Sequence, residues 1–322
     1  MKKTFISLII PTFKREFQLI KILTSIKKQI FDEINIEVII CDSFSEYDQT
    51  RFPKNNENFT LKYFNIDKNN LSAKRNFGIR NSTYDNIILL DDDCVPNKNF
   101  LREYVNAFEK IDKKTILSGI VEYPEDHIKK FNHIKYKDSR HFKIDHVEKD
   151  IDLDPDKIVA MNMGFIKSDS MKKIGFFDER FTGYGFEDYE FGYRYKKNGY
   201  LLKCVRASIL HDEGKPNFTK YMKKYFHLGR DGMKNLQIVD IISAKETVYY
   251  KIEEKQLFKL IKKIPKLNCL LSWIEKLIEK TDKMLFMNYS FIFTLARLCS
   301  YTRGYIEREK YFLNKNNQDW YE

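Results

Sequence analysis

The sequence predicts an α/β protein in which a mostly parallel sheet is flanked by helices and followed by a helical C-terminal region. Short apolar runs recur over about the first 100 residues and alternate with segments of helical spacing. The runs are continuous rather than alternating, as in strands buried on both faces. At 322 residues, 43% of them hydrophobic, the chain can form about two globular domains. We expect one over residues 1–214, with halves 1–100 and 101–214, and a second over residues 215–322.

The expected elements of the first half follow one another without long gaps. In chain order they are a strand in "FISLIIPTF", a helix in "REFQLIKILTSIKKQ", strands in "IEVIICDSFS" and "TLKYFNID", a helix opening at "LSAKRNFGIRNS", and a strand in "NIILLDDDCVP". The helix of residues 15–29 is indicated by apolar residues at Leu19, Ile22, Leu23 and Ile26.

The second half is less regular. Residues 122–158 are charged, rich in His and Lys, and predict a long excursion or flexible loop. A strand and a short helix are expected in "VAMNMGFIKSDSMKKIGFFDERF", a helix from about Glu187 to Asn198, and a strand in "YLLKCVRASILHDEG". Beyond Pro216 the pattern is helical and basic to the end.

Charge and cysteine content restrict the class of protein. Of the net charge of +11, residues 215–322 carry +9 and residues 1–214 only +2. A basic appendage on a near-neutral body argues against an enzyme that works on nucleic acid in a basic cleft. The five cysteines form no CxxC pair, which favours a reduced, cytoplasmic setting. The apolar run of the N-terminus stops at Pro11 without a cleavage site, so we interpret it as a buried strand and not a signal peptide.

Three acids at the end of a buried strand are the first chemical signal. Asp91, Asp92 and Asp93 follow four apolar residues directly. Such carboxylates repel one another unless a hard divalent cation or another counter-charge binds them. A solvated acidic turn is the alternative. His211 ends another apolar run and can complete a metal site, although a lone histidine is more often structural.

The stretch "FTGYGFEDYEFGYRY" raises a second possibility. Glu187 and Asp188 open a helix after a loop of glycines and aromatics, where a carboxylate can act as general base on a hydroxyl. The alternative is stabilisation of the helix N-terminus by negative charge. Lys74, Arg75 and Asn76 stand at another helix start, which suits a phosphate, with a solvated basic turn as the alternative.

Taken together, the motifs resemble the family 2 glycosyltransferases with a GT-A fold. The resemblance covers about residues 4–214 and rests on "SLIIPTFKR", "EVIICDS", "SAKRNFGIRNS", "ILLDDDCVP" and "GFFDERFTGYGFEDYEFGYRYKKNGY". The last is most similar to the segment shared by bacterial capsule-polymerising (chondroitin-polymerase-type) transferases and the galactosyltransferase/N-acetylgalactosaminyltransferase group. Residues 1–100 would then be the nucleotide-sugar half and residues 101–214 the acceptor half.

The resemblance also implies roles for individual residues. The nucleotide-sugar would be bound by Pro11, Thr12, Arg15, Asp42, Arg75, Asp91, Asp92 and Asp93, the acceptor by Tyr184, Gly185, Phe186 and Glu187, and the metal by Asp93 and His211. Asp188 would be the base, with Glu187 beside it in the catalytic pair. The family's usual tryptophan before the acidic pair is Phe186 here, and its common second acid after Asp42 is Ser43.

The expected activity is an inverting, metal-dependent transfer of a hexose, with Mn²⁺ or Mg²⁺ as cofactor. The resemblance implies UDP-galactose or a UDP-N-acetylhexosamine as donor, and as acceptor a glycan or lipid-linked glycan of a bacterial surface polysaccharide (capsule or lipopolysaccharide). Two other classes stay open. A nucleotidyltransferase would normally carry a glycine-rich loop after the first strand, where "PTFKRE" has no glycine. A non-catalytic protein that binds nucleic acid or a membrane surface would leave the strand-end acids unexplained.

The C-terminal region has two interpretations. "LFKLIKKIPKLNCLLSWIEKLIEK" mixes apolar residues with lysines at helical spacing, as an interfacial membrane helix would. The alternative is a helical subdomain that packs on the body or on another copy of the chain. The most apolar stretch, "MLFMNYSFIFTLA", is shorter than the ~20 residues a bilayer requires. Peripheral contact with the inner face of the cytoplasmic membrane would suit a lipid-linked acceptor.

Overall fold

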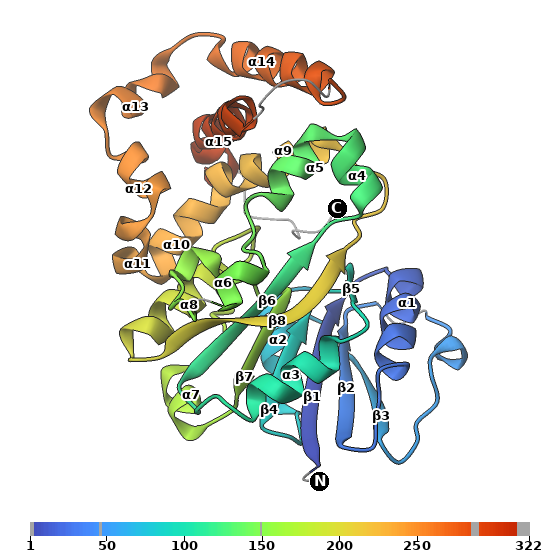
Figure 1. Ribbon diagram of the computed structural model, residues 1–322. Helices are drawn as coiled ribbons and strands as arrows, with labels where there is room; N and C mark the ends of the chain where they lie inside the picture. Colours follow the sequence, from blue (N-terminus) through green and yellow to red (C-terminus); the bar gives the residue numbers. More distant parts are fainter. Residues whose placement is uncertain (1–2, 45–46, 149, 285–289, 314–322) are drawn as a thin grey trace. The chain divides into compact units, whose positions relative to one another are not determined.

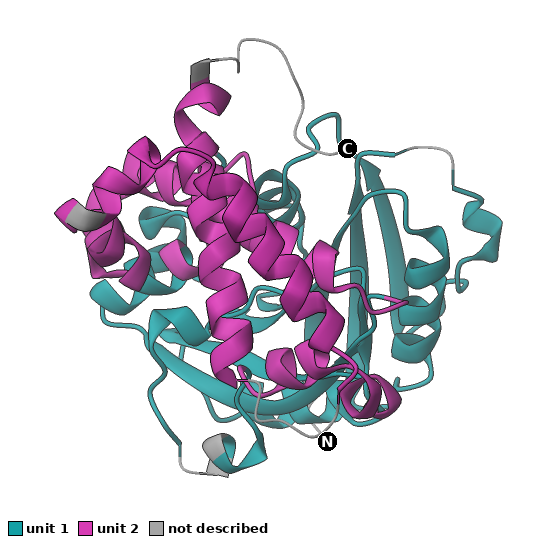
Figure 2. Cartoon of the chain, turned by 90° about the horizontal axis from the view of Figure 1, so that it is seen from above, with its two compact units in different colours: residues 1–124, 141–179, 191–213 teal, residues 125–140, 180–190, 214–322 magenta. Residues whose placement is uncertain are grey.

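The fold is described from a computed structural model, which covers residues 3–44, 47–148, 150–284 and 290–313 (Figure 1). The chain divides into two compact units (Figure 2). Unit 1 consists of residues 1–124, 141–179 and 191–213, and unit 2 of residues 125–140, 180–190 and 214–322. The expected single body over residues 1–214 stays a prediction, since the compact units interleave along the chain.

Unit 1 contains the β-sheet and the helices beside it. Its elements are β1 (Thr4–Thr12), α1 (Glu16–Lys27), β2 (Ile34–Asp42), η1 (Gln49–Arg51), β3 (Phe59–Asn65), α2 (Leu71–Arg80), β4 (Asn86–Leu90), β5 (Cys94–Pro96), α3 (Phe100–Phe108), β6 (Thr115–Glu122), α6 (Ile144–Glu148), η2 (Pro155–Lys157), β7 (Asn162–Ile166), α7 (Asp169–Ile174), most of α8 (Glu187–Lys197), and β8 (Leu201–His211).

The strands form one sheet in the order β3-β2-β1-β4-β7-β6-β8-β5. The pairs β3–β2, β2–β1, β1–β4 and β6–β8 are parallel, whereas β7 and β5 run antiparallel to their neighbours. In β2, in β4 and in β1 from Ile6 onward the apolar side chains are fully buried, which is why these strands lack the alternation of half-exposed strands. The predicted α/β class with a mostly parallel sheet is confirmed.

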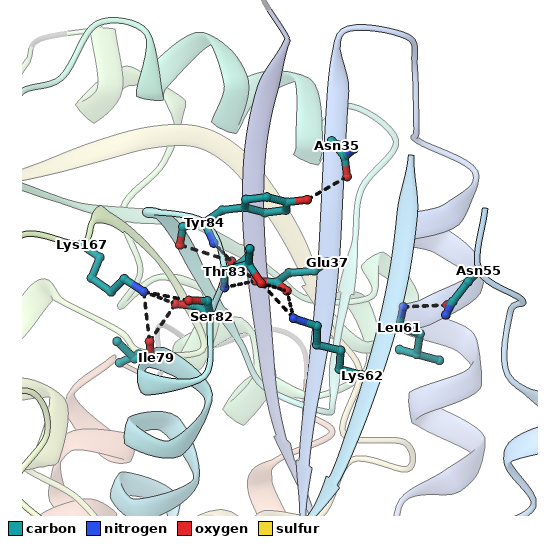
Figure 3. Close-up of polar contacts among 11 residues, drawn as sticks. Asn35, Glu37, Asn55, Leu61, Lys62, Ile79, Ser82, Thr83, Tyr84 and Lys167 are labelled. Carbon is teal, nitrogen blue, oxygen red and sulfur yellow. Dashed lines mark hydrogen bonds and ion pairs between the residues drawn. The ribbon is translucent and has the colours of Figure 1, made fainter. Parts of the chain in front are cut away.

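A polar network toward the amino ends of the strands ties β1, β2, β3 and the segment before β4 together (Figure 3). The buried carboxylate of Glu37 accepts hydrogen bonds from the Ser7 hydroxyl (2.5 Å), the Lys62 ammonium (2.5 Å) and the Thr83 backbone N–H (2.5 Å). Burial alone would raise the pKa of Glu37, but the hydrogen bonds from Lys62, Ser7 and Thr83 hold it below its ordinary value. The network therefore stabilises the end of the sheet away from the strand-end aspartates.

Unit 2 is helical. Its elements are α4 (Glu125–Lys130), α5 (Asn132–Asp138), the first turn of α8, α9 (Phe218–His227), the π-helical turn η3 (Leu228–Gly232), α10 (Met233–Val239), α11 (Ile241–Glu246), α12 (Val248–Glu253), α13 (Gln256–Leu260), η4 (Ile261–Lys263), α14 (Leu267–Thr281) and α15 (Ser290–Leu313). One apolar cluster joins α5, α9, α14 and α15, and another joins residues 181–189 to η3, α10 to α13 and α15.

The structure corrects one expectation and adds to others. Residues 122–158 do not form one irregular loop, because α4, α5, α6 and η2 lie within them. Their helices are short, and α5 is held by tertiary contacts such as the 2.7 Å contact of His133 Nδ1 with Asp282 Oδ2, which leave no long periodic pattern in the sequence. Helix α3 and strand β6 have no counterpart among the predicted elements.

The C-terminal region is helical, as expected, through the described part of the chain. Part of the most apolar stretch, residues 285–289, lies outside the described residues. Among the helices that are described, none combines the length and the apolar character needed to cross a bilayer.

Candidate active site

The register of the sheet gathers polar residues at the carboxyl ends of the central strands in unit 1. Thr12, the last residue of β1, pairs with Asp42, the last residue of β2. Asp93 comes directly before β5, whose first residue Cys94 pairs with His211 at the end of β8. Ligands of open α/β sheets bind at this edge. The structure thus brings together side chains that lie far apart in sequence.

The first two strand-end acids are held by side chains from β1 and α2. Nη2 of Arg75 lies 3.0 Å from Oδ1 of Asp91 in an ion pair. The Thr12 hydroxyl donates a hydrogen bond of 2.8 Å to Asp92. Burial raises the pKa of Asp92 to about 6, and the nearby charge of Arg15 opposes this rise. Thr12, Arg15 and Arg75 therefore lie at the aspartates, and their implied contacts with the nucleotide stay predictions.

Asp93 lies between a cation and an imidazole. Nη1 of Arg15 is 3.1 Å from Oδ2 of Asp93, and Nε2 of His211 is 3.4 Å from its Oδ1. Ligand atoms of Asp93, Cys94 and His211 lie within 4.8 Å of one another, which makes these residues a candidate metal centre. Glu213 approaches the same imidazole nitrogen at 3.7 Å.

The donor set of this centre fits a divalent cation such as Mn²⁺ through oxygen and nitrogen. Carboxylate oxygen suits Mn²⁺ and Mg²⁺, and a neutral imidazole accompanies it in many first-row metal sites. Cys94 is a weaker candidate, because burial raises the pKa of its thiol well above the ordinary value and a thiol must lose its proton to ligate. Asp93 and His211 are therefore the better candidates in this group, and their role as metal ligands stays a prediction.

Further side chains contact His211, and the sequence did not indicate them. The Tyr123 hydroxyl lies 3.3 Å from Nδ1 of His211 and 3.3 Å from Nε2 of His141. A partner on one imidazole nitrogen sets which nitrogen is left to face a metal. The sequence could have indicated Cys94, because it directly follows Asp93. It could not have indicated Tyr123 and His141, because they stand in the segment that was expected to be an irregular excursion.

Asp42 is buried and hydrogen-bonded within its own unit. Its carboxylate accepts 2.6 Å and 2.9 Å hydrogen bonds from the Tyr63 hydroxyl and the Phe44 backbone N–H. Burial raises the pKa of Asp42, and these two bonds counter it. Pro11 is buried in β1 opposite Cys41. Contact of Asp42 or Pro11 with a nucleotide base stays a prediction.

The basic start of α2 is not a solvated turn. Lys74 is buried, and its ammonium donates to the Thr12 carbonyl and the Asn69 side-chain oxygen, each at 2.7 Å. Burial lowers the pKa of Lys74 to about 8. Asn76 is buried too and hydrogen-bonds the backbone of Phe177. Lys74 therefore stabilises the end of β1 by donating to the carbonyl of its last residue.

The glycine- and aromatic-rich loop before α8 belongs to unit 2 and packs against η3. A Cβ on Gly183 would come within 2.4 Å of Oδ2 of Asp231, and one on Gly185 within 2.6 Å of Leu228. Gly185 also has a φ of +92°, which side chains rarely adopt. The missing side chains thus let the backbone approach its own chain, and contact of Gly185 with the acceptor stays a prediction.

Phe186 has an uncommon backbone conformation. Its φ is +73°, and strained residues of this kind cluster at functional sites. Its ring packs edge-on against Tyr189 and Tyr249, with centroids 6.0 and 6.1 Å away. Tyr184, by contrast, is exposed and lies 6.0 Å from the Lys224 ammonium in a cation–π contact. Of the predicted aromatic pair, Tyr184 is the more exposed.

Glu187 and Asp188 open α8 as predicted. An Asp188 carboxylate oxygen accepts a 2.9 Å hydrogen bond from the backbone N–H of Tyr189, so the helix start stabilises its charge. The pair belongs to unit 2, whereas the strand-end acids and His211 belong to unit 1. Their roles as acceptor ligand and base stay predictions.

Comparison with known proteins places these features in a family. The model of glycosyl transferase family 2 matches residues 7–172. The hyaluronan synthase of Pasteurella multocida is 29% identical over 277 residues, 76% of this chain and 28% of that protein. The chondroitin synthase of Escherichia coli is 25% identical over 292 residues, 81% of this chain and 41% of that protein. The chain thus spans less than half the length of these two relatives.

Solved structures support the same fold. The mannosyltransferase PcManGT from Pyrobaculum calidifontis, in complex with GDP-Man and Mn²⁺, aligns with a TM-score of 0.58 and 13% identity, covering 97% of this chain and 88% of that one. S. aureus TarS 1–349 in complex with UDP-GlcNAc aligns at 0.51 and 14% identity, covering 100% and 93%. The chain belongs to glycosyl transferase family 2 and has the GT-A fold.

Proposed function

We propose that the protein is an inverting, metal-dependent glycosyltransferase that moves a sugar from UDP-galactose or a UDP-N-acetylhexosamine to a hydroxyl of a surface-polysaccharide acceptor. The observation that carries the proposal is the pairing of Asp93 with His211, 3.4 Å apart at the carboxyl edge of the sheet and beside Arg15. The names of the hyaluronan and chondroitin synthases and the UDP-GlcNAc complex of TarS support the class of donor and product.

In the proposed reaction Asp188 takes the proton from the acceptor hydroxyl. The hydroxyl oxygen forms a bond to the anomeric carbon of the donor sugar, and the bond from that carbon to the nucleoside diphosphate breaks on the opposite face. The electron pair of the broken bond leaves with the diphosphate, so the configuration is inverted. Glu187 binds the acceptor beside the base, and Tyr184 offers its exposed ring to a sugar face.

The donor binds at the strand ends of unit 1 in this proposal. Asp93 and His211 would hold Mn²⁺ or Mg²⁺, and a bound cation supplies positive charge to the leaving diphosphate. Arg15 is within reach of the same carboxylate and adds a fixed cation. Asp91 and Asp92, anchored by Arg75 and Thr12, keep the loop after β4 in place.

The test is a melting-temperature panel of UDP, GDP, dTDP and CMP, each with Mn²⁺ or with EDTA. A ligand at about 100 times its Kd should stabilise the fold by roughly 2.7 kcal/mol. Stabilisation by UDP with Mn²⁺ and not with EDTA is the expected result. An absence of any shift would remove the main support for the transferase site. A shift with GDP instead of UDP would indicate that the donor is a GDP-sugar.

We further propose that α14 contacts an anionic membrane surface. Leu270, Trp273 and Leu277 recur along one face of this helix and are 52%, 58% and 40% exposed. Exposed lysines at positions 266, 276 and 280 follow the same face. Apolar side chains flanked by lysines suit the boundary between lipid headgroups and acyl chains. A peripheral position at the inner face of the membrane would bring the enzyme to a lipid-linked acceptor.

Co-sedimentation with vesicles tests this contact. The protein should bind vesicles that contain anionic lipid and lose most binding in Trp273→Glu. Phe17→Glu is the matched control, because Phe17 is 73% exposed on α1 in unit 1. Equal, low binding of all three proteins would reject the membrane role, and a Trp273-dependent dimer in solution would assign the face to self-association.

A further inference from the structure

Helix α15 of unit 2 carries three arginines with different partners. Arg303 lies 2.8 Å from a Glu275 carboxylate oxygen, and Arg308 lies 2.9 Å from one of Glu253. Arg297 differs, because no carboxylate in the described part of the chain forms an ion pair with it. It is only partly exposed, so water alone does not surround its charge.

Tyrosines surround Arg297 instead. Its Nη1 donates to the Tyr136 hydroxyl at 2.7 Å and its Nη2 to the Tyr249 hydroxyl at 3.2 Å. The guanidinium carbon lies 4.4 Å from the ring centroid of Tyr225, and Nε is buried without a hydrogen-bond partner among the described residues. We call Arg297 with Tyr136, Tyr225 and Tyr249 the Arg297 cage.

The cage compensates the charge only in part. Phenol oxygens and ring faces attract a guanidinium through dipoles and quadrupoles, but they bring no net negative charge. A partly buried charge without a counter-charge is costly, and arginine is usually retained at such a place where it pairs with an anion. The planar guanidinium matches carboxylate and phosphate, which accept two parallel hydrogen bonds.

Tyr249 connects the Arg297 cage with the predicted acceptor motif. Tyr249, which hydrogen-bonds Arg297, lies 6.1 Å ring to ring from Phe186, the residue before Glu187. Phe186, Tyr225 and Tyr249 pack against the same apolar cluster of unit 2. An anionic group held at Arg297 would therefore belong to a ligand that also lies along residues 184–188.

We infer that the Arg297 cage binds an anionic group of the acceptor, a sugar carboxylate or a phosphate. The inference rests on the proposed function and narrows its acceptor to charged glycans. Arg297 is then a specificity-determining residue that favours a charged acceptor over its neutral analogue.

The experiment compares small probes on the full chain at constant ionic strength. Methyl β-glucuronide and inorganic phosphate are titrated against melting temperature and by calorimetry, with uncharged methyl β-glucoside and additional NaCl as references. The wild type should bind at least one anion saturably and more tightly than the glucoside. Arg297→Gln removes one charged hydrogen-bond donor, so the affinity for that anion should fall about 10- to 100-fold. Comparison of the glucuronide with phosphate decides between a sugar acid and a phosphate.

Arg303→Gln is the matched control on the same helix. It should bind the anion like the wild type but melt at a lower temperature, because Glu275 loses its counter-charge. Arg297→Gln should melt no lower than the wild type without ligand. Equal anion affinity of Arg297→Gln and wild type would overturn the inference, as would equal binding of glucoside and glucuronide. If Arg297→Gln does not fold, Arg297→Lys keeps the charge without the planar fork and should bind the anion about tenfold more weakly.

UDP with Mn²⁺ separates this inference from the proposed function. Arg297→Gln should retain the nucleotide-dependent rise in melting temperature. If the wild type lacks that rise, the proposed function fails. If the rise is present but anion binding does not depend on Arg297, only the charged-acceptor inference fails.

Discussion

The Nε2 atom of His211 lies 3.4 Å from Oδ1 of Asp93, at the point where β8 ends and β5 begins. The two residues are far apart in sequence, and the pairing of Cys94 with His211 across the strands brings them together. Because the backbone register between β5 and β8 holds the pair together, the two side chains already lie side by side without a bound ligand. A preorganised imidazole and carboxylate are what a site that binds metal and diphosphate requires.

Replacement of His211 should impair metal-dependent nucleotide binding. His211→Ala leaves Asp93 as the single expected ligand, and affinity for UDP with Mn²⁺ should fall by about 100-fold or more, since even partners of ligands contribute 10- to 100-fold. Calorimetric titration of UDP with and without Mn²⁺ measures the change. An unchanged metal dependence would exclude His211 from the centre.

The Tyr123 hydroxyl should affect metal binding through its contact with His211. Tyr123→Phe removes the group 3.3 Å from Nδ1 of His211 while keeping the ring, so metal affinity should fall about tenfold with little change in stability. Titration of Mn²⁺ in the presence of a fixed UDP concentration reports the effect. Wild-type Mn²⁺ affinity would show that this hydroxyl does not set the orientation of the imidazole.

Asp188→Asn should reduce turnover without weakening nucleotide binding. Loss of a positioned base typically costs about 10²–10⁴-fold in rate, and the amide cannot take the proton. The turnover number and the UDP affinity are measured separately. Asp169→Asn is the control, because Asp169 also lies in the first turn of a helix and is exposed. Near-normal turnover of Asp188→Asn would assign the base to another residue.

Glu37→Gln should affect stability rather than catalysis. The substitution removes a charge that Lys62 and three hydrogen bonds stabilise, so the free energy of unfolding should fall by about 1–3 kcal/mol near neutral pH. The partial exposure of Lys62 keeps the expected loss at this level. Urea unfolding measures it, while the KM for the donor should stay unchanged because the network lies away from the strand-end aspartates.

The same variant predicts a pH dependence. The pKa of Glu37 is lower in the folded protein than in the unfolded chain, so the unfolded chain binds more protons as the pH falls. The contribution of Glu37 is fully present above the unfolded pKa and disappears as the pH falls through the folded one. The stability difference between wild type and Glu37→Gln should therefore shrink on acidification below about pH 4.5, and a constant difference would contradict the assignment.

Much of unit 1 could be predicted from local sequence. Continuous apolar runs such as Leu8–Ile10 and Val38–Cys41 can bury both faces of a strand, and they are too short between turns for a buried helix. Because β1, β2 and β4 are parallel, their carboxyl ends meet at one edge of the sheet. The positions of Thr12, Asp42 and Asp91–Asp93 at that edge could therefore be predicted.

The partners of those residues could not be predicted, because they depend on which distant side chains pack nearby. Gly183 and Gly185 make room for η3, and residues 122–158, which the sequence assigned to a loop, contain Tyr123 and α5. Neither relation has a periodic pattern, since each joins segments of different elements.

The sequence by itself determined the α/β class, the family and the edge of the sheet where the acids gather, because burial period and strand direction are local properties. The tertiary structure alone decided that Tyr123 lies beside His211 and that Arg297 lies among tyrosines without a carboxylate partner in the described chain. Charge pairing and hydrogen bonding at these places are set by packing between elements, and no local pattern of residues specifies them.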